Sequence, residues 1–247
     1  SLRNLEPAVR GHARKLVEAL VKKPEFELMS ELAFPLPAHA ALGLIGAPEE
    51  DFELIKQWGD KRVLFSYGRL SPEEQVDVAE KVGLFWQYCE EFVATRDADR
   101  QDDFTSDLLA YRDENPDAVT LDDVTNIIYS MILAGHESTT NAIGCGFRHL
   151  LANRDQWQAV VDDPTLAENA TEECLRFDPP VLGHRRLSAR DTSVGGVPIP
   201  KGAGLIMMFG AAHRDPARFP DPDRFDVRRE EARTHLTFGK GVHFCLG

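Results

Sequence analysis

The sequence has little cysteine, and no two of its cysteines are close together. There are four cysteines, and none of them forms a C-x-x-C pair: Cys89, Cys145, Cys174 and Cys245. A zinc ribbon needs such pairs, and a small secreted domain needs a dense disulfide framework, so both classes are excluded. Isolated thiols are typical of a reducing compartment, which favours the cytoplasm.

Long hydrophobic runs and an excess of positive charge are also absent. The best apolar segments, Ile127–Gly135 and Gly202–Ala212, have about half of the ~20 residues that cross a bilayer. The formal net charge of −13 argues against binding to nucleic acid or to an anionic membrane. The opening stretch, residues 1–20, has the pattern of an amphipathic helix rather than of a signal peptide.

The chain otherwise has an ordinary globular composition, with helix signals through its first two-thirds. Hydrophobic residues make up 43% and charged residues 28%, which suits a packed domain. Proline and acidic residues predict a helix over 48–65. Ser71 and Glu74 have the spacing of a capping box, which opens a helix that could reach Ala94. We expect the charged stretch 95–103 to be a solvated turn.

The longest helical pattern covers residues 121–153, about 50 Å at 1.5 Å per residue. Thr120 is its predicted N-cap. It is apolar nearly all round, which predicts a central, buried helix. Shorter helices are expected over 155–161 and 165–177, the second ended by Asp178-Pro179-Pro180.

The last quarter of the chain changes from helix to strand signals. The segments 192–194 and 197–199 flank Gly195-Gly196, which predicts a two-residue hairpin. Residues 205–209 form a short apolar strand pattern. The proline-rich stretch 213–226 has no period and predicts an ordered irregular segment. The expected fold class is therefore mainly α with small β-sheets.

The chain ends on FGKGVHFCLG, which presents Cys245 on a glycine-rich loop. Gly239 and Gly241 allow the backbone to approach a flat ligand closely. Phe238 supplies an apolar wall, and His243 supplies a polar group. A lone thiolate suits an iron already held by a macrocycle better than it suits zinc. An inert buried cysteine and a nucleophilic cysteine are the alternatives at this point.

This loop resembles the cysteine-ligand loop of the cytochrome P-450 family, the haem-thiolate monooxygenases. The family pattern F-G-x-G-x-H-x-C-x-G is met at every fixed position. The resemblance covers nearly the whole chain and implies a cytochrome P-450 fold, with the long central helix over the haem and a single domain over 1–247. It implies that Cys245 binds the iron of heme b (iron protoporphyrin IX), and that Phe238, Gly239 and Gly241 lie against the cofactor.

A second motif is Glu173-Cys174-Leu175-Arg176. An acid and an arginine three residues apart are commonly a surface pair on a helix. EECLRFDPPV resembles the family helix in which this pair is buried. The resemblance implies that an arginine of the irregular segment joins the pair, and FPDPDRFD supplies Arg224 there. The implied role of Glu173, Arg176 and Arg224 is structural.

A third motif is AGHESTTNAI, inside the long helix. The hydroxyl groups can bond back to carbonyls one turn earlier, which predicts a locally opened turn. A metalloprotease H-E-x-x-H site is excluded, because Thr140 stands where the second histidine is needed. The resemblance implies that Ala134 lies over the haem and that an acid and an alcohol, Glu137 and Ser138, supply protons. Threonine is commoner at the alcohol position, so Thr139 could share that role.

The fourth motif, HRRLSARD, precedes the glycine hairpin. The resemblance implies that one arginine here binds a haem propionate. Its spacing to Asp191 favours Arg186 over Arg185. His243 is then expected near the other propionate.

The function implied by the resemblance is insertion of one atom of O2 into a small lipophilic molecule. No flavin or nucleotide motif is present, so electrons are expected from a ferredoxin or flavodoxin-type donor and its reductase. A haem-thiolate peroxygenase and a non-enzymatic gas sensor or carrier are the alternatives. Relatives that use peroxide typically carry Arg-Pro in place of Glu137-Ser138, and a sensor has no need of that pair.

The resemblance also implies that the sequence is an internal piece of a longer protein. Family members begin earlier and continue beyond the cysteine loop. We therefore expect the isolated chain to bind haem poorly and to be inactive. The pattern over residues 32–52 resembles the soluble bacterial branch, which again favours a cytoplasmic enzyme without a membrane anchor.

Overall fold

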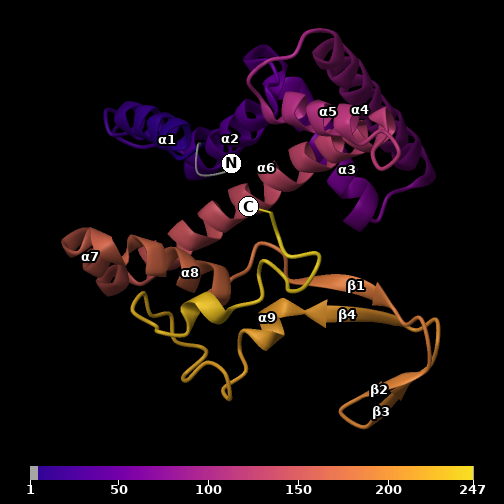
Figure 1. Cartoon of the computed structure of the whole chain (residues 1–247). Coiled ribbons are helices and arrows are strands. Elements are labelled where there is room, and N and C mark those ends of the chain that lie inside the picture. The colour runs from indigo at the N-terminus through magenta and orange to yellow at the C-terminus, as the bar shows by residue number, and fades with distance from the viewer. Residues whose placement is uncertain (1–4, 247) are drawn as a thin grey trace. The chain divides into compact units, whose positions relative to one another are not determined.

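The computed structural model describes residues 5–246, and only the backbone of residues 60 and 65–67. The chain divides into two compact units, Ser1–Thr140 and Asn141–Gly247. The boundary falls within the long helix α6 (Leu121–Ala152) (Figure 1). The predicted helix at 121–153 is thus confirmed to within one residue.

The described residues of the first unit form helices and no strands. The chain makes a π-helical turn at Met29–Ala33 and a 3₁₀ turn at Glu49–Asp51. The helices, besides the first part of α6, are α1 (Glu6–Leu20), α2 (Pro35–Ile45), α3 (Phe52–Tyr67), α4 (Pro72–Ala98) and α5 (Phe104–Glu114).

One stripe of α6 lies in the core of this unit. Val124, Ile128 and Ile132 recur every four residues and are at most 4% exposed. They belong to one apolar cluster with Phe85 of α4 and Leu109 of α5, as expected for an amphipathic helix against its neighbours. The expectation of burial nearly all round is wrong for this half of α6, since Leu121 and Ile127 are exposed.

The N-terminus of α4 has the predicted capping box. The Ser71 hydroxyl accepts from the Glu74 amide at 3.2 Å, and the Glu74 carboxylate accepts from the Ser71 amide at 2.8 Å. The helix continues to Ala98, beyond the expected end at Ala94. Asp97 in its last turn pairs with Arg112 of α5 at 3.0 Å. This tertiary ion pair explains why the charged stretch begins as helix and not as a turn.

Ser71→Ala removes the hydroxyl acceptor of this box. We expect the substitution to lower the free energy of unfolding by about 1 kcal/mol, because one amide of the first turn loses its partner. Urea denaturation followed by far-UV circular dichroism measures the change. An effect indistinguishable from that of Ser130→Ala, an exposed serine within α6, would contradict the capping role.

The second unit combines short helices with two small sheets. The helices predicted at 155–161 and 165–177 are confirmed as α7 and α8, the second preceded by a 3₁₀ turn at Pro164–Leu166. The predicted irregular segment begins directly after α9. Besides the last part of α6, the elements are α7 (Arg154–Asp162), α8 (Ala167–Phe177), β1 (Gly183–Leu187), β2 (Thr192–Val194), β3 (Val197–Ile199), β4 (Gly204–Met208) and α9 (Phe209–Ala212).

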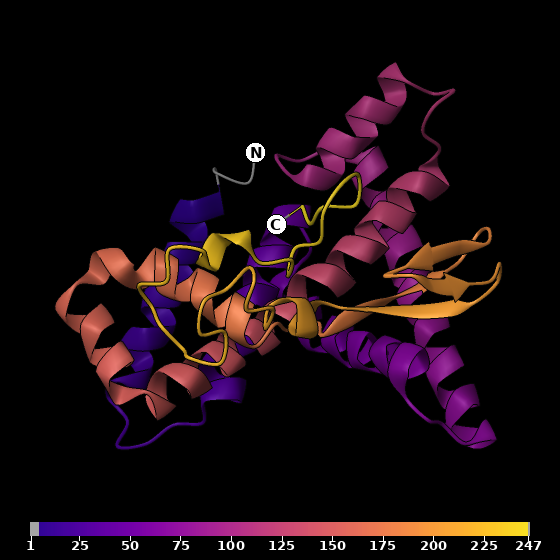
Figure 2. The same cartoon turned by 90° about the horizontal axis from the view of Figure 1, so that it is seen from below.

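Both sheets are antiparallel two-stranded ribbons (Figure 2). The predicted hairpin is confirmed: Val194 pairs with Val197, and the two glycines between them have φ of +57° and +81°. Such angles fit a type I′ turn, which glycine adopts without steric cost. Strand β1 was not expected, because its sequence GHRRL has no apolar alternation. It pairs with β4 from Gly183 opposite Met208 to Leu187 opposite Gly204.

A small core holds α8 to the segment that follows α9. Ala170 and Cys174 of α8 pack with Phe225 and Val227. Burial raises the pKa of the Cys174 thiol to about 12, so this cysteine is a core residue without thiolate character. In the described part of the chain, no helix has both the length and the apolar character needed to cross a membrane.

Candidate active site: the cysteine loop, its support and the acid–alcohol motif

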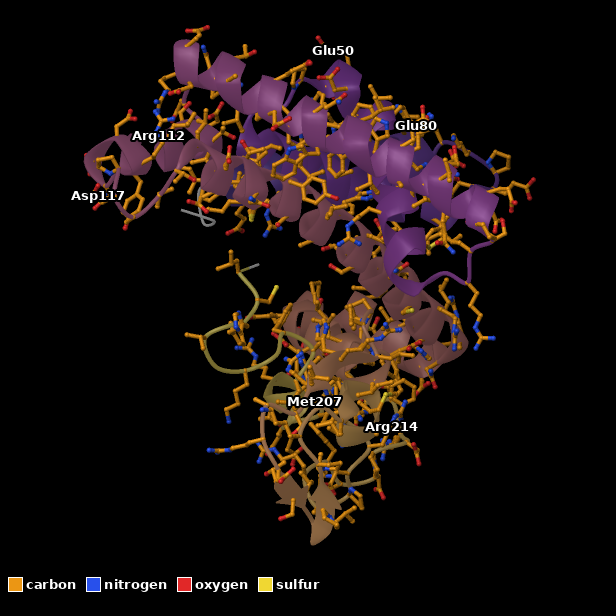
Figure 3. The ribbon with its side chains drawn as sticks, turned by 90° about the vertical axis from the view of Figure 1, so that its right-hand side faces the viewer. Glu50, Glu80, Arg112, Asp117, Met207 and Arg214 are labelled. Atoms are coloured by element: carbon orange, nitrogen blue, oxygen red, sulfur yellow. The ribbon has the colours of Figure 1, made fainter. Side chains whose placement is uncertain are left out.

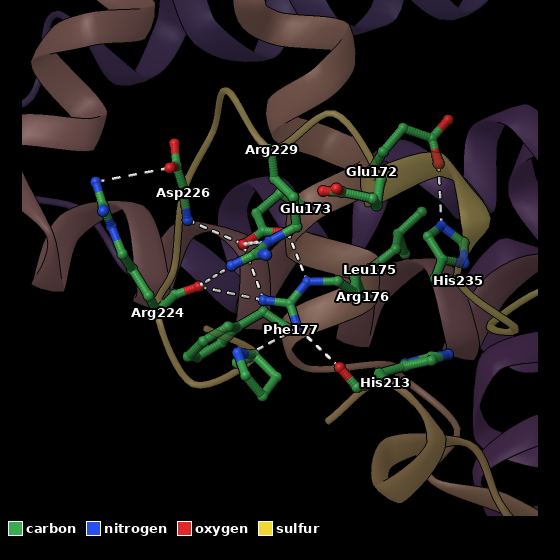
Figure 4. A network of polar contacts seen from close by, with 12 residues as sticks. Glu172, Glu173, Leu175, Arg176, Phe177, His213, Arg224, Asp226, Arg229 and His235 are labelled. Atoms are coloured by element: carbon green, nitrogen blue, oxygen red, sulfur yellow. Dashed lines mark hydrogen bonds and ion pairs between the residues drawn. The ribbon is translucent and has the colours of Figure 1, made fainter. Parts of the chain in front are cut away.

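Glu173 and Arg176 form a fully buried ion pair in α8. Both side chains are 0% exposed, and the guanidinium makes two bonds to the carboxylate, at 2.7 and 2.9 Å. The predicted burial and pairing are therefore confirmed (Figure 4). This two-point geometry is the strong form of an arginine–carboxylate contact.

The third member of this cluster is Arg229, and the assignment of Arg224 is wrong. Arg229 lies 3.2 Å from the Glu173 carboxylate, with a side chain only 6% exposed. The Arg224 side chain is 66% exposed and pairs with Asp226 at 3.6 Å. Arg224 contributes its carbonyl oxygen, which accepts from Arg176 and Arg229.

Backbone carbonyls satisfy the remaining donors of the two buried arginines. Arg176 donates to the carbonyls of His213 and Pro222, each at 2.9 Å. Arg229 donates to the carbonyls of Pro220 and Asp221. A buried charge is tolerated when its hydrogen-bonding groups are paired in this way. The cluster thereby fastens the irregular segment 213–229 to α8.

The cysteine loop is closed by three backbone hydrogen bonds. The Gly239 amide donates to the Leu236 carbonyl at 2.8 Å, and the Phe244 amide to the Gly241 carbonyl at 3.0 Å. The Cys245 amide donates to the Phe238 carbonyl at 2.9 Å. Gly239 and Gly241 have φ of +71° and +87°, which explains glycine at both positions. The last glycine of the motif, Gly247, lies outside the described residues.

Cys245 is exposed, and so is the apolar surface of its loop. Val242 is 100% exposed, Phe244 57% and Leu246 76%. Among the described residues, no group of three His, Cys, Asp or Glu side chains could hold a metal ion. A metal at Cys245 therefore needs ligands that the described residues do not supply. A macrocycle that carries its own iron and covers apolar side chains fits this donor set.

The two candidate propionate arginines lie on β1. Arg185 is opposite Ile206 and Arg186 is opposite Leu205, and both arginines are exposed. Successive side chains of a strand point to opposite faces. Only one of the two arginine side chains can therefore lie on the face of the β1–β4 sheet that a given ligand contacts. His243, the other candidate, is exposed on the cysteine loop.

The acid–alcohol motif lies on a continuous stretch of α6. The Ser138 hydroxyl donates to the Ala134 carbonyl at 2.9 Å, and that of Thr140 to the His136 carbonyl at 3.0 Å. The helix stays α-helical here, so the predicted open turn is not present. Ser138 is half-buried and Thr139 is exposed.

Glu137 lines a small cavity within the first unit. The cavity has a volume of about 20 Å³, room for roughly one water molecule. Its walls are apolar side chains of α2, α3 and α6, and its polar groups come from Lys56, His136 and Glu137. Glu137 is thus half-buried beside an apolar pocket. A half-buried carboxyl group beside a water-sized cavity is suited to exchange a proton with a water molecule in that cavity.

Sequence and structure comparisons identify similar proteins over nearly the whole chain. The family model described as Cytochrome P450 matches residues 157–247. Cytochrome P450 monooxygenase PikC of Streptomyces venezuelae is 35% identical over 98% of this chain and 57% of the relative. Vitamin D(3) 25-hydroxylase of Pseudonocardia autotrophica is 34% identical over 100% of this chain and 59% of the relative.

Solved structures agree with these sequence matches. Cytochrome P450 CREJ in complex with (4-ethylphenyl) dihydrogen phosphate has a TM-score of 0.95 and 38% identity, over 99% of this chain and 61% of that one. The heme domain of CYP116B5 from Acinetobacter radioresistens has a TM-score of 0.95 and 31% identity, over 100% of this chain and 60% of that one. The chain thus spans about three-fifths of the length of these relatives.

Proposed function

Because the chain belongs to the cytochrome P450 family, we propose that it acts in a haem-dependent monooxygenase that inserts one atom of O2 into a small lipophilic molecule. The observation that carries the proposal is the exposed Cys245, on a loop closed onto Phe238. A structural cysteine would be buried in apolar surroundings, as Cys174 is. A cysteine held at the surface of a glycine-rich loop suits a ligand of iron.

We assign the cofactor as heme b. Cys245 would ligate the haem iron, and Phe238, Gly239 and Gly241 would contact the macrocycle; Ala134 is assigned to the cofactor as well. Arg186 and His243 bind its propionates, which charge-assisted hydrogen bonds favour. When bound, the haem supplies the oxidising chemistry, and its thiolate ligand favours O–O cleavage.

Glu137, Ser138 and Thr139 serve as the proton-transfer groups. Glu137 would transfer a proton through its carboxyl group, since Glu137 lines a cavity of about 20 Å³. Ser138 donates its own hydroxyl proton to the Ala134 carbonyl, which leaves its oxygen lone pairs free to accept another. Thr139 is exposed one residue further along α6. Positioned general acids of this kind typically contribute about 10²–10⁴-fold to rate.

The electron donor is proposed to be a ferredoxin or flavodoxin with its reductase, in the cytoplasm. Named relatives support a lipophilic substrate. One is called a steroid C26-monooxygenase. Another, P450BioI, was solved in complex with acyl carrier protein ligated to hexadec-9Z-enoic acid.

The reduced, carbon monoxide-treated protein tests this function through its difference spectrum. We expect the strongly red-shifted Soret band of a haem-thiolate centre in a chimera in which this chain replaces the matching segment of PikC. Cys245→Ser should abolish the band, because an alcohol does not provide the thiolate. The chain alone is measured in parallel, with a weak band or none expected.

Cys145→Ser is the matched control, since Cys145 is a half-buried cysteine of α6. It should leave the band unchanged. A red-shifted band that survives Cys245→Ser, or its absence from the unmodified chimera, would contradict the proposed function.

A further inference from the structure

Two buried histidines lie beside the backbone that leads into the cysteine loop. His213 follows α9 and is 0% exposed, and the His235 side chain is 2% exposed. Their ring centroids are 5.8 Å apart. Neither is part of the Glu173–Arg176–Arg229 cluster, although both adjoin it (Figure 4).

Each imidazole accepts a hydrogen bond from the backbone that leads into the loop. Nε2 of His213 accepts from the Leu236 amide at 2.8 Å. Nδ1 of His235 accepts from the Thr237 amide at 3.1 Å. Only a neutral imidazole has an acceptor nitrogen. The two bonds therefore require both histidines to be neutral, in opposite tautomers.

The second nitrogen of each ring is a donor in these tautomers. Nε2 of His235 lies 3.0 Å from the Glu172 carboxylate, to which it donates a hydrogen bond. Nδ1 of His213 is buried and has no hydrogen-bond partner among the described residues. A buried donor without a partner carries a free-energy cost. The tautomer that accepts from Leu236 therefore leaves Nδ1 unpaired within the described part of the chain, which costs free energy. This cost indicates that the hydrogen bond to Leu236 has a role of its own.

The two histidines connect α8 to the cysteine loop. The His213 carbonyl accepts from Arg176 at 2.9 Å, while its ring holds Leu236. The next residue, Thr237, donates from its hydroxyl to the Leu175 carbonyl at 2.7 Å. Phe238 follows, and its carbonyl accepts from the Cys245 amide at 2.9 Å. A continuous series of hydrogen bonds and one peptide segment therefore links the buried arginine to the cysteine.

We propose that His213 and His235 are positioning residues that set the register of the cysteine loop by accepting hydrogen bonds from the backbone amides of Leu236 and Thr237. The inference rests on the proposed function, because the purpose of that register is to present Cys245 to the haem iron. Neither histidine touches the reacting atoms. Each acts through the backbone that its ring holds.

The electrostatic surroundings favour the neutral rings. Burial, followed by the electrostatic effect of His235, lowers the pKa of His213 from the ordinary 6.5 to about 4. The backbone hydrogen bond with Arg176 opposes this shift, while the positive charges of Arg176 and Arg214 favour it. Burial also lowers the pKa of His235, against the opposing effect of Glu172. A histidine with a depressed folded-state pKa stabilises the fold above its ordinary pKa. That contribution is lost as the pH falls from about 6.5 towards 4.

Ring ¹⁵N NMR of the chain tests the tautomers without haem. At pH 7 we expect a protonated Nδ1 in His213 and a protonated Nε2 in His235, with the amides of Leu236 and Thr237 protected from exchange. Two cationic rings, or the reverse tautomers, would overturn the inference. This readout does not depend on the chemistry at Cys245.

Variants of His213 test the link to the loop in the haem-loaded chimera. His213→Leu removes the acceptor, and about tenfold faster exchange of the Leu236 amide is expected, with a matching loss of the thiolate Soret band. His213→Gln offers an amide oxygen near the Nε2 position and should restore both readouts. His39→Gln is the matched control: it changes a histidine of α2 whose pKa burial also lowers, and should alter neither readout.

The outcomes for the His213 variants decide between a positioning role and no such role. Unchanged exchange at Leu236 in His213→Leu would overturn the proposal, as would an unchanged Soret band. If His213→Leu fails to fold, normal Leu236 exchange and a normal Soret band in His213→Gln, together with the wild-type tautomers, support the proposal. Loss of both readouts in His213→Gln as well overturns it. Correct tautomers with no thiolate band in the wild-type chimera would refute the proposed function alone.

Discussion

Arg229→Leu is expected to lower the free energy of unfolding by about 3–5 kcal/mol, because it removes one partner of a buried charge cluster. Glu173 and Arg176 are 0% exposed and Arg229 is 6% exposed. The leucine would also leave the carbonyls of Pro220 and Asp221 without their donor. A loss of this size is a large part of the ~5–15 kcal/mol that stabilises a typical domain.

Arg224→Leu is the matched control, in the same segment and with the same change of side chain. The Arg224 side chain is 66% exposed and is paired with Asp226, and an exposed ion pair of that kind contributes little. Urea denaturation of both variants, followed by circular dichroism, compares them directly. Equal losses, or a larger loss for Arg224→Leu, would refute the assignment of Arg229 to the cluster.

The same cluster predicts a consequence for the cofactor. It fastens the segment 213–229 to α8, and the cysteine loop follows that segment. Arg229→Leu should therefore weaken the thiolate Soret band of the chimera even where the protein remains folded. Arg224→Leu should leave the band intact. A stability loss without any spectral change would confine the cluster to a purely structural role.

Glu137→Gln is expected to lower the rate of product formation by about 10²-fold or more in the haem-loaded chimera, because an amide cannot donate the proton that a carboxylic acid supplies. Glutamine keeps the size of the side chain at the cavity that Glu137 lines with His136 and Lys56. The expected loss is in the rate, with substrate binding and the Soret band unchanged. Steady-state turnover with a ferredoxin and its reductase measures it.

Glu80→Gln is the control, since Glu80 is an exposed acid on α4, on the outer side of the first unit (Figure 3). It changes the charge by the same amount and should not affect turnover. Ser138→Ala and Thr139→Ala, tested in parallel, identify the alcohol. If Glu137→Gln turns over at the wild-type rate, the proton-transfer role of Glu137 is refuted.

Local sequence patterns were sufficient to predict much of the fold. The Ser71–Glu74 capping box and the Gly195-Gly196 turn were predicted and are present. Both depend on contacts between residues at most three apart, or on the φ that glycine allows. The boundaries of α6 followed from the length of its apolar pattern in the same way. The cysteine loop was recognised because its fixed spacing is itself local.

The predictions from the sequence failed where a contact with a residue far along the chain decides the conformation. The sequence of strand β1 has no alternation of apolar and polar residues. The strand forms because each of its residues pairs with a residue of β4. The charged turn expected after Ala94 begins as helix because Arg112 pairs with Asp97. In each case a contact across many residues outweighs the local preference.

By itself, the sequence determined that this is a mainly helical chain with a cysteine presented on a glycine-rich loop and an acid–alcohol pair on a long helix. Spacing and residue chemistry carry that information. Only the tertiary structure decided that Arg229, and not Arg224, completes the buried cluster, and that His213 holds the loop through Leu236. The physical reason is that burial and hydrogen-bond partners across tens of residues are set by packing, which no local pattern records.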